Sequence, residues 1–181
     1  MHVPLVLTDF LDRAVELYGD KVAVIDEERT FTYSDLNRRV NRLARGLQNA
    51  GVGKGDKVAY LAPNSVEMLE GFYGVFSVGG IMTPLNTRLK PEEYRFILTH
   101  SESRVLLVDR ELLHLVEPIL DGVPTLEKVV VHGEYRGSMP IMKNGLLLSE
   151  GTLSIGSRLR RRILPPFCTR AERLEIRRAS C

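Results

Sequence analysis

Residues 104–108 read RVLLV, a short run in which apolar residues follow one another without polar alternation. A strand with one face in water alternates apolar and polar residues, whereas a strand covered on both faces is apolar throughout. A second run of this kind, VVVH, occupies residues 129–132. Both runs predict strands buried inside a parallel sheet.

Helical and strand patterns alternate around these two runs. Pro91 opens one of the helices, at the first turn, where its missing N–H leaves no helical bond unmade. The expected strands are residues 57–61 and 81–83, and the expected helices are residues 65–78, 91–100 and 111–120. Because strand and helix alternate, the predicted fold class is α/β, with a parallel sheet covered by helices.

The first fifty residues predict a helix, a hairpin and a longer helix. Thr8 is expected to cap the first helix and Gly19 to end it. Two β-branched runs, 22–25 and 30–32, flank the charged turn DEER and indicate a hairpin. The longer helix is expected from Ser34 to Ala50, with Gly51 as its left-handed cap. One face of it is apolar (Leu36, Val40, Leu43, Ala44, Leu47), and the other carries Arg38, Arg39, Arg42 and Arg45.

The composition is that of an ordinary soluble protein, with 44% hydrophobic and 27% charged residues. The longest apolar stretch, residues 75–85, contains Gly79, Gly80 and Pro84 and is too short to span a membrane. The first residues, MHVP, lack the basic region of a signal peptide. We therefore expect a cytoplasmic protein.

The chain changes character near residue 140. Residues 1–140 hold 16 basic and 20 acidic side chains, whereas residues 141–181 hold 9 and 3 and show no regular periodicity. This predicts two parts, a domain over residues 1–140 and an unstructured, basic tail over residues 141–181. Cys168 and Cys181 lie in that tail without metal-ligand spacing, so we expect neither a metal site nor a disulfide.

The arginines of the tail allow a second interpretation. Residues 158–162, RLRRR, could neutralise the phosphates of a nucleic acid or the surface of an anionic membrane. The only aromatic residue of the tail is Phe167, which leaves no surface on which bases could stack. We expect no nucleic-acid partner, although a non-catalytic binding module with a basic tail stays an alternative.

The glycine-rich segment GVGKGD, residues 51–56, invites comparison with a phosphate-binding loop. Such a loop needs four residues between its first Gly and the Gly-Lys pair, followed by Ser or Thr, where this chain has Gly55. It should also follow a strand and open a helix, whereas this segment precedes a strand. We therefore predict a helix cap followed by a turn.

Other polar residues show no catalytic pattern. The four histidines, at positions 2, 100, 114 and 132, share no metal or triad spacing and are expected at surfaces or element ends. Ser34 and Ser65 are expected at helix starts, without the G-x-S-x-G motif of a nucleophile. Asp26 and Asp109 follow strands, where both ligand-binding and turn-forming acids occur. We assign no catalytic, cofactor-binding or metal-binding residue.

Three stretches of the chain occur in a fixed order. The first is FTYSDL at residues 31–36. The second runs from GDKVA at 55–59 through PNS at 63–65 to Glu67. The third runs from Gly79-Gly80 through PLNTRL at 84–89 and PEE at 91–93 to VLLVD at 105–109. Together they cover most of residues 8–132 and resemble the amino-terminal part of the acyl-CoA synthetases and related adenylate-forming ligases, and their common order makes the resemblance specific.

The resemblance implies a reaction that this chain lacks the parts to perform. The family joins a carboxylic acid, such as a fatty acid, to ATP, releasing pyrophosphate, and passes the acyl group to coenzyme A. It uses magnesium, a Ser/Thr/Gly-rich phosphate loop and a lysine from a carboxy-terminal domain. The matching region corresponds to scaffold, with Gly79 and Gly80 in close packing and Asn86 and Arg88 at turn and surface positions. We expect the chain alone neither to bind ATP, magnesium or CoA usefully nor to adenylate an acid.

The tail is consistent with a shifted reading frame. If each codon of residues 163–181 is moved back by one base, synonymous choices allow DPATLLYTSGTTGDPKGVM, which resembles the phosphate-binding signature of the family at all nineteen positions. Residues 142–163 likewise allow an acidic linker. Our hypothesis is a single-base change near residues 140–143. The alternative is a split ligase, in which a downstream chain supplies the rest.

Overall fold

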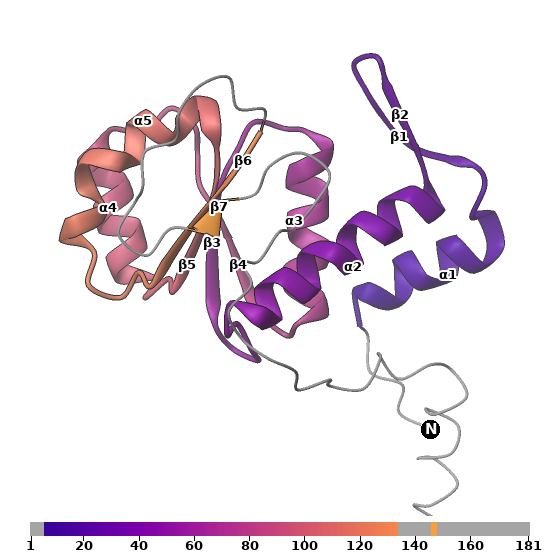
Figure 1. Cartoon of the computed structure of the whole chain (residues 1–181), viewed down its shortest axis with the longest axis horizontal. Helices are drawn as coiled ribbons and strands as arrows, with labels where there is room; N and C mark the ends of the chain where they lie inside the picture. Colours follow the sequence, from indigo (N-terminus) through magenta and orange to yellow (C-terminus); the bar gives the residue numbers. More distant parts are fainter. Residues whose placement is uncertain (1–5, 134–145, 148–181) are drawn as a thin grey trace, which may run out of the picture.

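The computed structural model describes residues 6–133 and the backbone of residues 146 and 147 (Figure 1). The amino-terminal elements are α1 (Thr8–Tyr18), β1 (Val22–Asp26), β2 (Arg29–Thr32) and α2 (Tyr33–Asn49). These are followed by β3 (Lys57–Leu61), α3 (Val66–Ser77), β4 (Ile81–Pro84), α4 (Pro91–His100) and β5 (Val105–Asp109). The last described elements are the 3-10 helix η1 (Arg110–Leu112), α5 (Leu113–Val116), the 3-10 helix η2 (Glu117–Gly122), β6 (Lys128–His132) and β7 (Leu146–Leu147).

The main sheet is parallel, in the order β4-β3-β5-β6-β7. Ala59 on β3, the second strand of this sheet, pairs with Thr83 of β4 on one side and with Leu106 of β5 on the other. Four of the five residues of β3, and four of the five of β5, are buried. The observed sheet confirms the α/β prediction drawn from the apolar runs.

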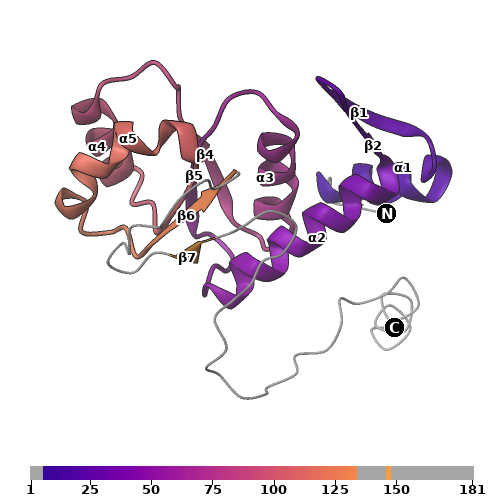
Figure 2. The same cartoon turned by 45° about the horizontal axis from the view of Figure 1, so that its top comes forward.

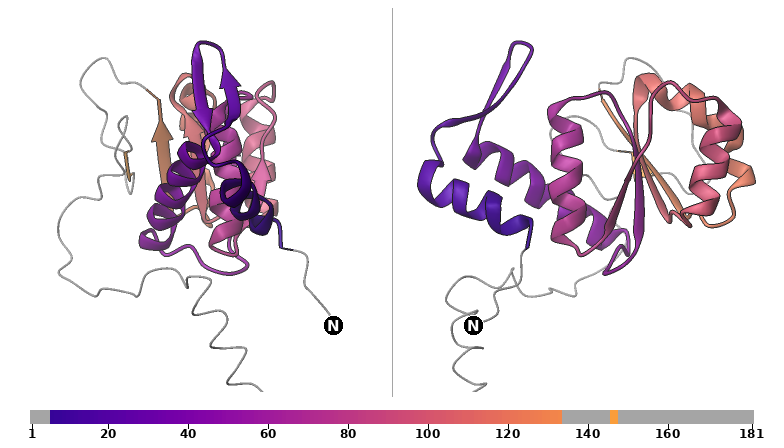
Figure 3. Two further views of the ribbon diagram at one scale, coloured as in Figure 1. Left: turned by 90° about the vertical axis from the view of Figure 1, so that its right-hand side faces the viewer. Right: turned by 180° about the vertical axis from the view of Figure 1, so that it is seen from behind.

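Helices cover both faces of the sheet, α2 and α3 on one and α4 and α5 on the other (Figure 3). Alternate residues of each strand point to opposite faces. Val58 and Leu107 accordingly pack with α2 and α3, whereas Leu106 packs with Tyr94 and Leu98 of α4. Each face of the sheet therefore has its own buried apolar cluster.

The connections change direction at the middle of the sheet. From β3 the chain passes through α3 to β4 at one edge, and then returns through α4 to β5 on the other side of β3. In open α/β sheets, ligands bind at the carboxyl ends of the strands beside such a reversal. The loops after β3 and β5 are therefore the first place to look for a site.

An amino-terminal lobe, made of α1, β1 and β2, lies at one end of the molecule, away from the main sheet (Figures 1 and 2). Its two strands form the predicted antiparallel hairpin. Leu11 and Val24 of the lobe pack against Leu36, Val40 and Val66 of α2 and α3. The lobe is thus attached to the sheet through these two helices.

A capping box joins the lobe to α2. The Thr32 hydroxyl accepts a hydrogen bond from Asp35 N at 3.1 Å, and the Asp35 carboxylate accepts one from Thr32 N at 3.1 Å. The helix ends as predicted, with Gly51 in the left-handed region at φ 85°. Leu36, Val40, Ala44 and Leu47 of the predicted apolar face are buried, and Leu43 packs against the buried cluster.

Three expectations about secondary structure are wrong in part. The stretch from 111 to 120 is not one helix but η1, α5 and η2, because Pro118 lacks the N–H that a continuous helix needs. Leu7 rather than Thr8 stands at the cap of α1, and no side chain caps it. Residues 146 and 147, expected to be unstructured, form β7 alongside β6. The rest of the predicted tail lies outside the described residues.

Within the part of the chain that the structure describes, the helices are all too short or too polar to cross a membrane.

Candidate functional site

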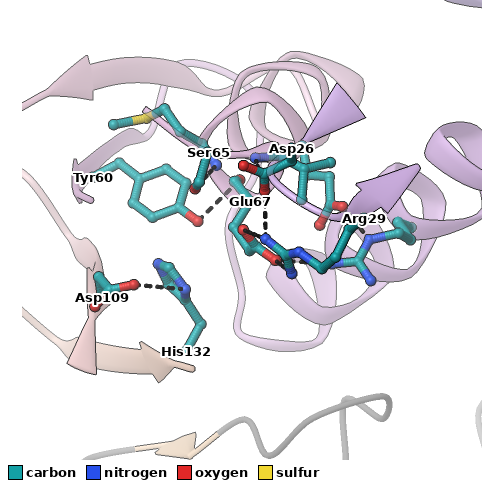
Figure 4. A network of polar contacts seen from close by, with 11 residues as sticks. Asp26, Arg29, Tyr60, Ser65, Glu67, Asp109 and His132 are labelled. Carbon is teal, nitrogen blue, oxygen red and sulfur yellow. Dashed lines mark hydrogen bonds and ion pairs between the residues drawn. The ribbon is translucent and has the colours of Figure 1, made fainter. Parts of the chain in front are cut away.

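Asp109 and His132 face each other at the carboxyl ends of β5 and β6 (Figure 4). They are register partners in the parallel ladder, and His132 Nδ1 lies 3.7 Å from Asp109 Oδ2. A second Asp109 oxygen accepts a hydrogen bond from Glu111 N at 2.8 Å, which caps η1. The carboxylate therefore both starts the next element and faces the imidazole.

Tyr60 of β3 contacts the same imidazole. Its ring meets that of His132 edge-to-face, with centroids 5.3 Å apart and planes at 85°. The Tyr60 hydroxyl donates a hydrogen bond to the Glu67 carbonyl at 3.0 Å, which ties β3 to the first turn of α3. Burial raises the pKa of Tyr60 above its ordinary value, so the phenol keeps its proton.

His132 is held in the neutral form. Burial lowers its pKa below the ordinary value of 6.5, against the opposing effect of the Asp109 carboxylate. Among the described residues, its buried Nε2 has no hydrogen-bond partner. A neutral imidazole with one unpaired nitrogen can accept or donate a single hydrogen bond, but it carries no charge for an anion.

A network of charged side chains lies next to this cluster, between the hairpin and α3 (Figure 4). Arg29 donates to Glu67 at 2.8 Å and also pairs with Asp26. Asp26 in turn accepts a hydrogen bond from Val66 N at 3.2 Å, at the start of α3. Ser65 caps the same helix by accepting from Met68 N at 3.4 Å. Asp26 thus acts as a helix cap supplied by the hairpin.

Arg39 of α2 extends the network. It pairs with Glu70 and lies 3.4 Å from Glu67. Burial raises the pKa of Glu70, against the opposing effect of Arg39. Burial also opposes ionisation of Glu67, but the hydrogen bonds that its carboxylate accepts and the charge of Arg29 together outweigh it and lower the pKa of Glu67. Buried carboxylates need such partners to stay ionised. The network fixes the hairpin on α2 and α3, which is a structural role.

A shallow groove of about 310 Å³ opens between the hairpin and α3. Its walls are mainly apolar, and Asn64 and Ser65, in the loop that leads from β3 to α3, form part of it. The full lining is Val24, Ile25, Asp26, Asn64, Ser65, Val66, Met68, Leu69 and Phe72. The groove therefore adjoins the sheet edge at which α/β folds bind ligands.

The other segments considered from sequence have structural roles. Gly51–Asp56 lies between α2 and β3, and the Asp56 carboxylate accepts from Gly53 N at 2.8 Å, which confirms the cap and turn. Gly79 has φ 75°, and a Cβ on Gly80 would lie 2.9 Å from Val75, which confirms close packing. Asn86 Oδ1 accepts from Arg88 N at 2.9 Å in a turn.

The histidines and serines also lie where their patterns placed them. His100 ends α4 and stacks on Phe96 with centroids 5.6 Å apart, and His114 Nδ1 lies 2.7 Å from the Glu111 carbonyl oxygen. Ser34 is in the first turn of α2. His2 lies outside the described residues. Sequence reasoning missed the Asp109–His132 pair: each residue was expected at the end of a buried strand, but only the sheet order places the two strands side by side.

The described residues offer hydrogen-bonding groups at the sheet edge but little catalytic chemistry. No group of three or more His, Cys, Asp or Glu side chains within residues 6–133 could hold a metal ion. Ser65 is engaged as a helix cap, and Asp26 and Glu67 are paired with arginine. Within the described residues, these side chains hold the elements at the sheet edge in place and do not themselves form a catalytic site.

A profile of AMP-binding enzymes matches residues 11–145. The chain belongs to the AMP-binding enzyme family. Its relatives include a long-chain-fatty-acid–CoA ligase of Thermus thermophilus, 41% identical over 138 residues, which are 74% of this chain and 26% of that protein. Another is a 3-hydroxybenzoate–CoA ligase of Aromatoleum sp., 35% identical over 64% of this chain and 22% of the relative. This chain thus spans about a quarter of the length of these relatives.

Solved structures of the family share the same arrangement. The anthranilate–CoA ligase AuaEII, in complex with anthranoyl-AMP, matches with a TM-score of 0.69 and 34% identity over 72% of this chain and 26% of that one. A fatty acyl CoA synthetase of Mycobacterium tuberculosis matches with a TM-score of 0.66 and 31% identity over 69% and 26%. This chain is therefore an amino-terminal portion of an adenylate-forming ligase, as its three motifs predicted.

Proposed function

We propose that this chain is the scaffold portion of an ATP-dependent carboxylic acid–CoA ligase and is catalytically inactive alone. The observation that carries the proposal is coverage: the chain matches CoA ligases at up to 41% identity among those described above, but over only about a quarter of their length. Asp26, Ser65 and Glu67, which lie beside the sheet edge, are engaged in helix caps and an ion pair.

The proposed full-length reaction is acid plus ATP plus CoA giving acyl-CoA, AMP and pyrophosphate, with magnesium. The relatives are named for long-chain fatty acids and for 3-hydroxybenzoate, so they support a carboxylic acid and leave its class open. We propose a fatty acid as the first substrate to test, because the relative that is 41% identical is named for one. The proposed location is the cytoplasm, which fractionation of cells expressing a tagged chain would test.

We also propose that the tail is encoded out of frame. The family profile ends at residue 145, close to residues 140–143, where the frame is proposed to change. Sequencing the coding DNA from codon 130 onward tests this directly. A reading one base upstream that spells the phosphate-loop signature supports the proposal, and a reading that lacks it overturns it.

The inactivity of the chain is tested with purified protein. The 181-residue chain is incubated with ATP, magnesium and a panel of fatty and aromatic acids, and acid-dependent release of pyrophosphate is measured. We expect no release above a buffer blank. The Thermus relative serves as a positive control for the assay, and acid-dependent release by the 181-residue chain would contradict the proposal.

A further inference from the structure

The imidazole of His132 lies at the very end of β6 and is largely buried at the carboxyl edge of the sheet (Figure 4). Its Nδ1 lies 3.7 Å from Asp109 Oδ2, which is longer than a hydrogen bond. Its buried Nε2 has no partner among the described residues. The ring is therefore held mainly by packing, edge-to-face against Tyr60.

The neutral and the charged imidazole need different hydrogen bonds in this position. A neutral ring has one N–H donor and one acceptor, whereas a protonated ring donates from both nitrogens and carries a charge. A buried charge is stable only with partners. Asp109 can reach Nδ1 after a shift of about 1 Å, but no group within residues 6–133 bonds Nε2. The closed arrangement therefore favours the neutral ring.

The ionisable groups around the imidazole come from four neighbouring elements. They are Asp109 of β5, Tyr60 of β3, Glu67 of α3, and Arg110 of η1 beside Gly133. β7, on the other side of β6, is formed by two leucines. Asp109 and Glu67 favour the charged ring, but Glu67 is already paired with Arg29. Burial outweighs both acids and holds the pKa of His132 below its ordinary value.

The place of His132 at a strand end allows a local release. β6 pairs with β5 over Lys128–His132, and His132 forms the last pair, opposite Asp109. The next residue, Gly133, has φ 112°, a conformation that glycine adopts readily and other residues rarely adopt. The chain therefore turns directly after the imidazole. Freeing this strand end breaks far fewer contacts than unfolding the whole sheet.

We propose that His132 is an acid-sensitive latch: taking up a proton from solvent releases the carboxyl end of β6 from β5. The two states are a closed end with a neutral ring and an open end with a hydrated imidazolium. The released segment lies at the edge of the sheet where α/β folds bind ligands. This inference does not depend on the proposed function.

The direction and size of the pH effect follow from proton linkage. In the open state the exposed imidazole has its ordinary pKa of about 6.5. Below this pH the open end therefore binds a proton that the closed end does not. The equilibrium constant for opening should rise as pH falls, by at most about tenfold per pH unit, and should stop rising below the pKa of the closed state.

Hydrogen exchange of the 181-residue chain measures this release. Mass spectrometry compares peptides that cover β6 and β3 at about pH 7.5 and about pH 5.5, with each rate divided by the intrinsic rate at that pH. We expect the opening constant of β6 to exceed that of β3 at both pH values, because only the end of β6 has to separate. On acidification it should increase several-fold, to at most about tenfold.

Two variants assign the effect to the latch, and circular dichroism shows whether each is folded. His132→Phe keeps an aromatic ring against Tyr60 but cannot take up a proton, so the increase on acidification should disappear. Asp109→Asn keeps an oxygen that can accept from Glu111 N, but removes the charge that favours imidazolium. It should make the increase on acidification larger.

Four results would overturn the inference. The first is an opening constant of β6 that is the same at both pH values. The second is an equal increase in His132→Phe, because another group would then be titrating. The third is an equal opening constant for β6 and β3, because the sheet would then open as a whole. The fourth is a smaller increase in Asp109→Asn, because the carboxylate would then oppose the closed state of the charged ring.

Discussion

The main sheet and the amino-terminal lobe differ in how far their apolar side chains are buried. In the sheet, β3 and β5 are buried on both faces by helices that the same chain provides. In the lobe, α1 buries Leu11 but leaves Phe10 and Leu17 in contact with water. Apolar burial is the main source of folding free energy. The sheet should therefore dominate the stability of the chain, and the lobe should contribute less.

The largest predicted effect concerns the sheet. Leu106→Ala on β5 removes a fully buried side chain that packs against Tyr94 and Leu98, and should lower the free energy of unfolding by about 3 kcal/mol. Leu17→Ala on α1 is the matched change in the lobe, and because Leu17 is 55% exposed its effect should stay within about 0.5 kcal/mol. Urea denaturation of both variants measures the two free energies of unfolding. Equal decreases for the two variants would contradict the conclusion that the sheet dominates the stability of the chain.

A second prediction concerns the contact between α3 and the sheet. A Cβ on Gly71 would lie 2.1 Å from the Tyr60 ring, so Gly71→Ala must displace the ring or the helix. Overpacking of this kind should lower the free energy of unfolding by about 2 kcal/mol. Gly53→Ala is the control, since its Cβ would meet no atom closer than 3.9 Å. Thermal unfolding tests both, and an unchanged midpoint for Gly71→Ala would show that the sheet adapts more easily than its packing indicates.

A third prediction concerns the capping box between the lobe and α2. Thr32→Ala removes the hydroxyl that accepts from Asp35 N, and should lower the free energy of unfolding by about 1 kcal/mol at neutral pH. Thr8→Ala is the control, because Thr8 starts α1 without a side-chain cap bond. If Thr8→Ala has the larger effect in urea denaturation, the observed assignment of caps is wrong.

The capping box also has a pH dependence. Hydrogen bonds from the Thr32 hydroxyl and backbone lower the pKa of Asp35, so its stabilising effect is present above the unfolded pKa and is lost as pH falls through the folded pKa. The difference between the parent chain and Asp35→Asn should therefore be larger at pH 7 than at pH 3. A difference independent of pH would contradict the role of the carboxylate.

The smallest predicted effect concerns His132 at the sheet edge. Its side chain is only 15% exposed, and burial lowers its pKa, so below pH 6.5 the unfolded chain binds a proton that the folded chain does not. Stability should fall as pH decreases from about 6.5 toward the folded pKa. His132→Phe should reduce this dependence. Titrating the histidine ring protons by NMR measures the same shift directly.

Local patterns predicted most of the fold because they depend on neighbours in the chain. The β3 and α4 ranges were predicted to the residue, since each has a period and clear ends. The stretch from 111 to 120 was predicted wrongly because its helical period hides the effect of Pro118 on the backbone. Leu146–Leu147 was missed because a two-residue strand has too short a pattern to recognise, and only its pairing with β6 defines it.

The site was less predictable than the fold. Asp26, Ser65, Asp109 and His132 were each noted from sequence as ends of elements, but nothing in the spacing showed which would meet. Asp26 and Val66 are joined by a hydrogen bond across forty residues, and the register of β5 and β6 brings Asp109 to His132. Such contacts depend on how separate elements pack.

The amino-acid sequence by itself determined the α/β class, the helices and strands, and membership of the adenylate-forming ligases, because hydrophobic period and motif order are properties of the chain. Only the tertiary structure decided the strand order, the Asp109–His132 pair and the exposure of apolar side chains on the amino-terminal lobe. The physical reason is that each arises between segments distant in sequence, where packing against α2, α3 and the sheet selects which side chains meet and which stay in water.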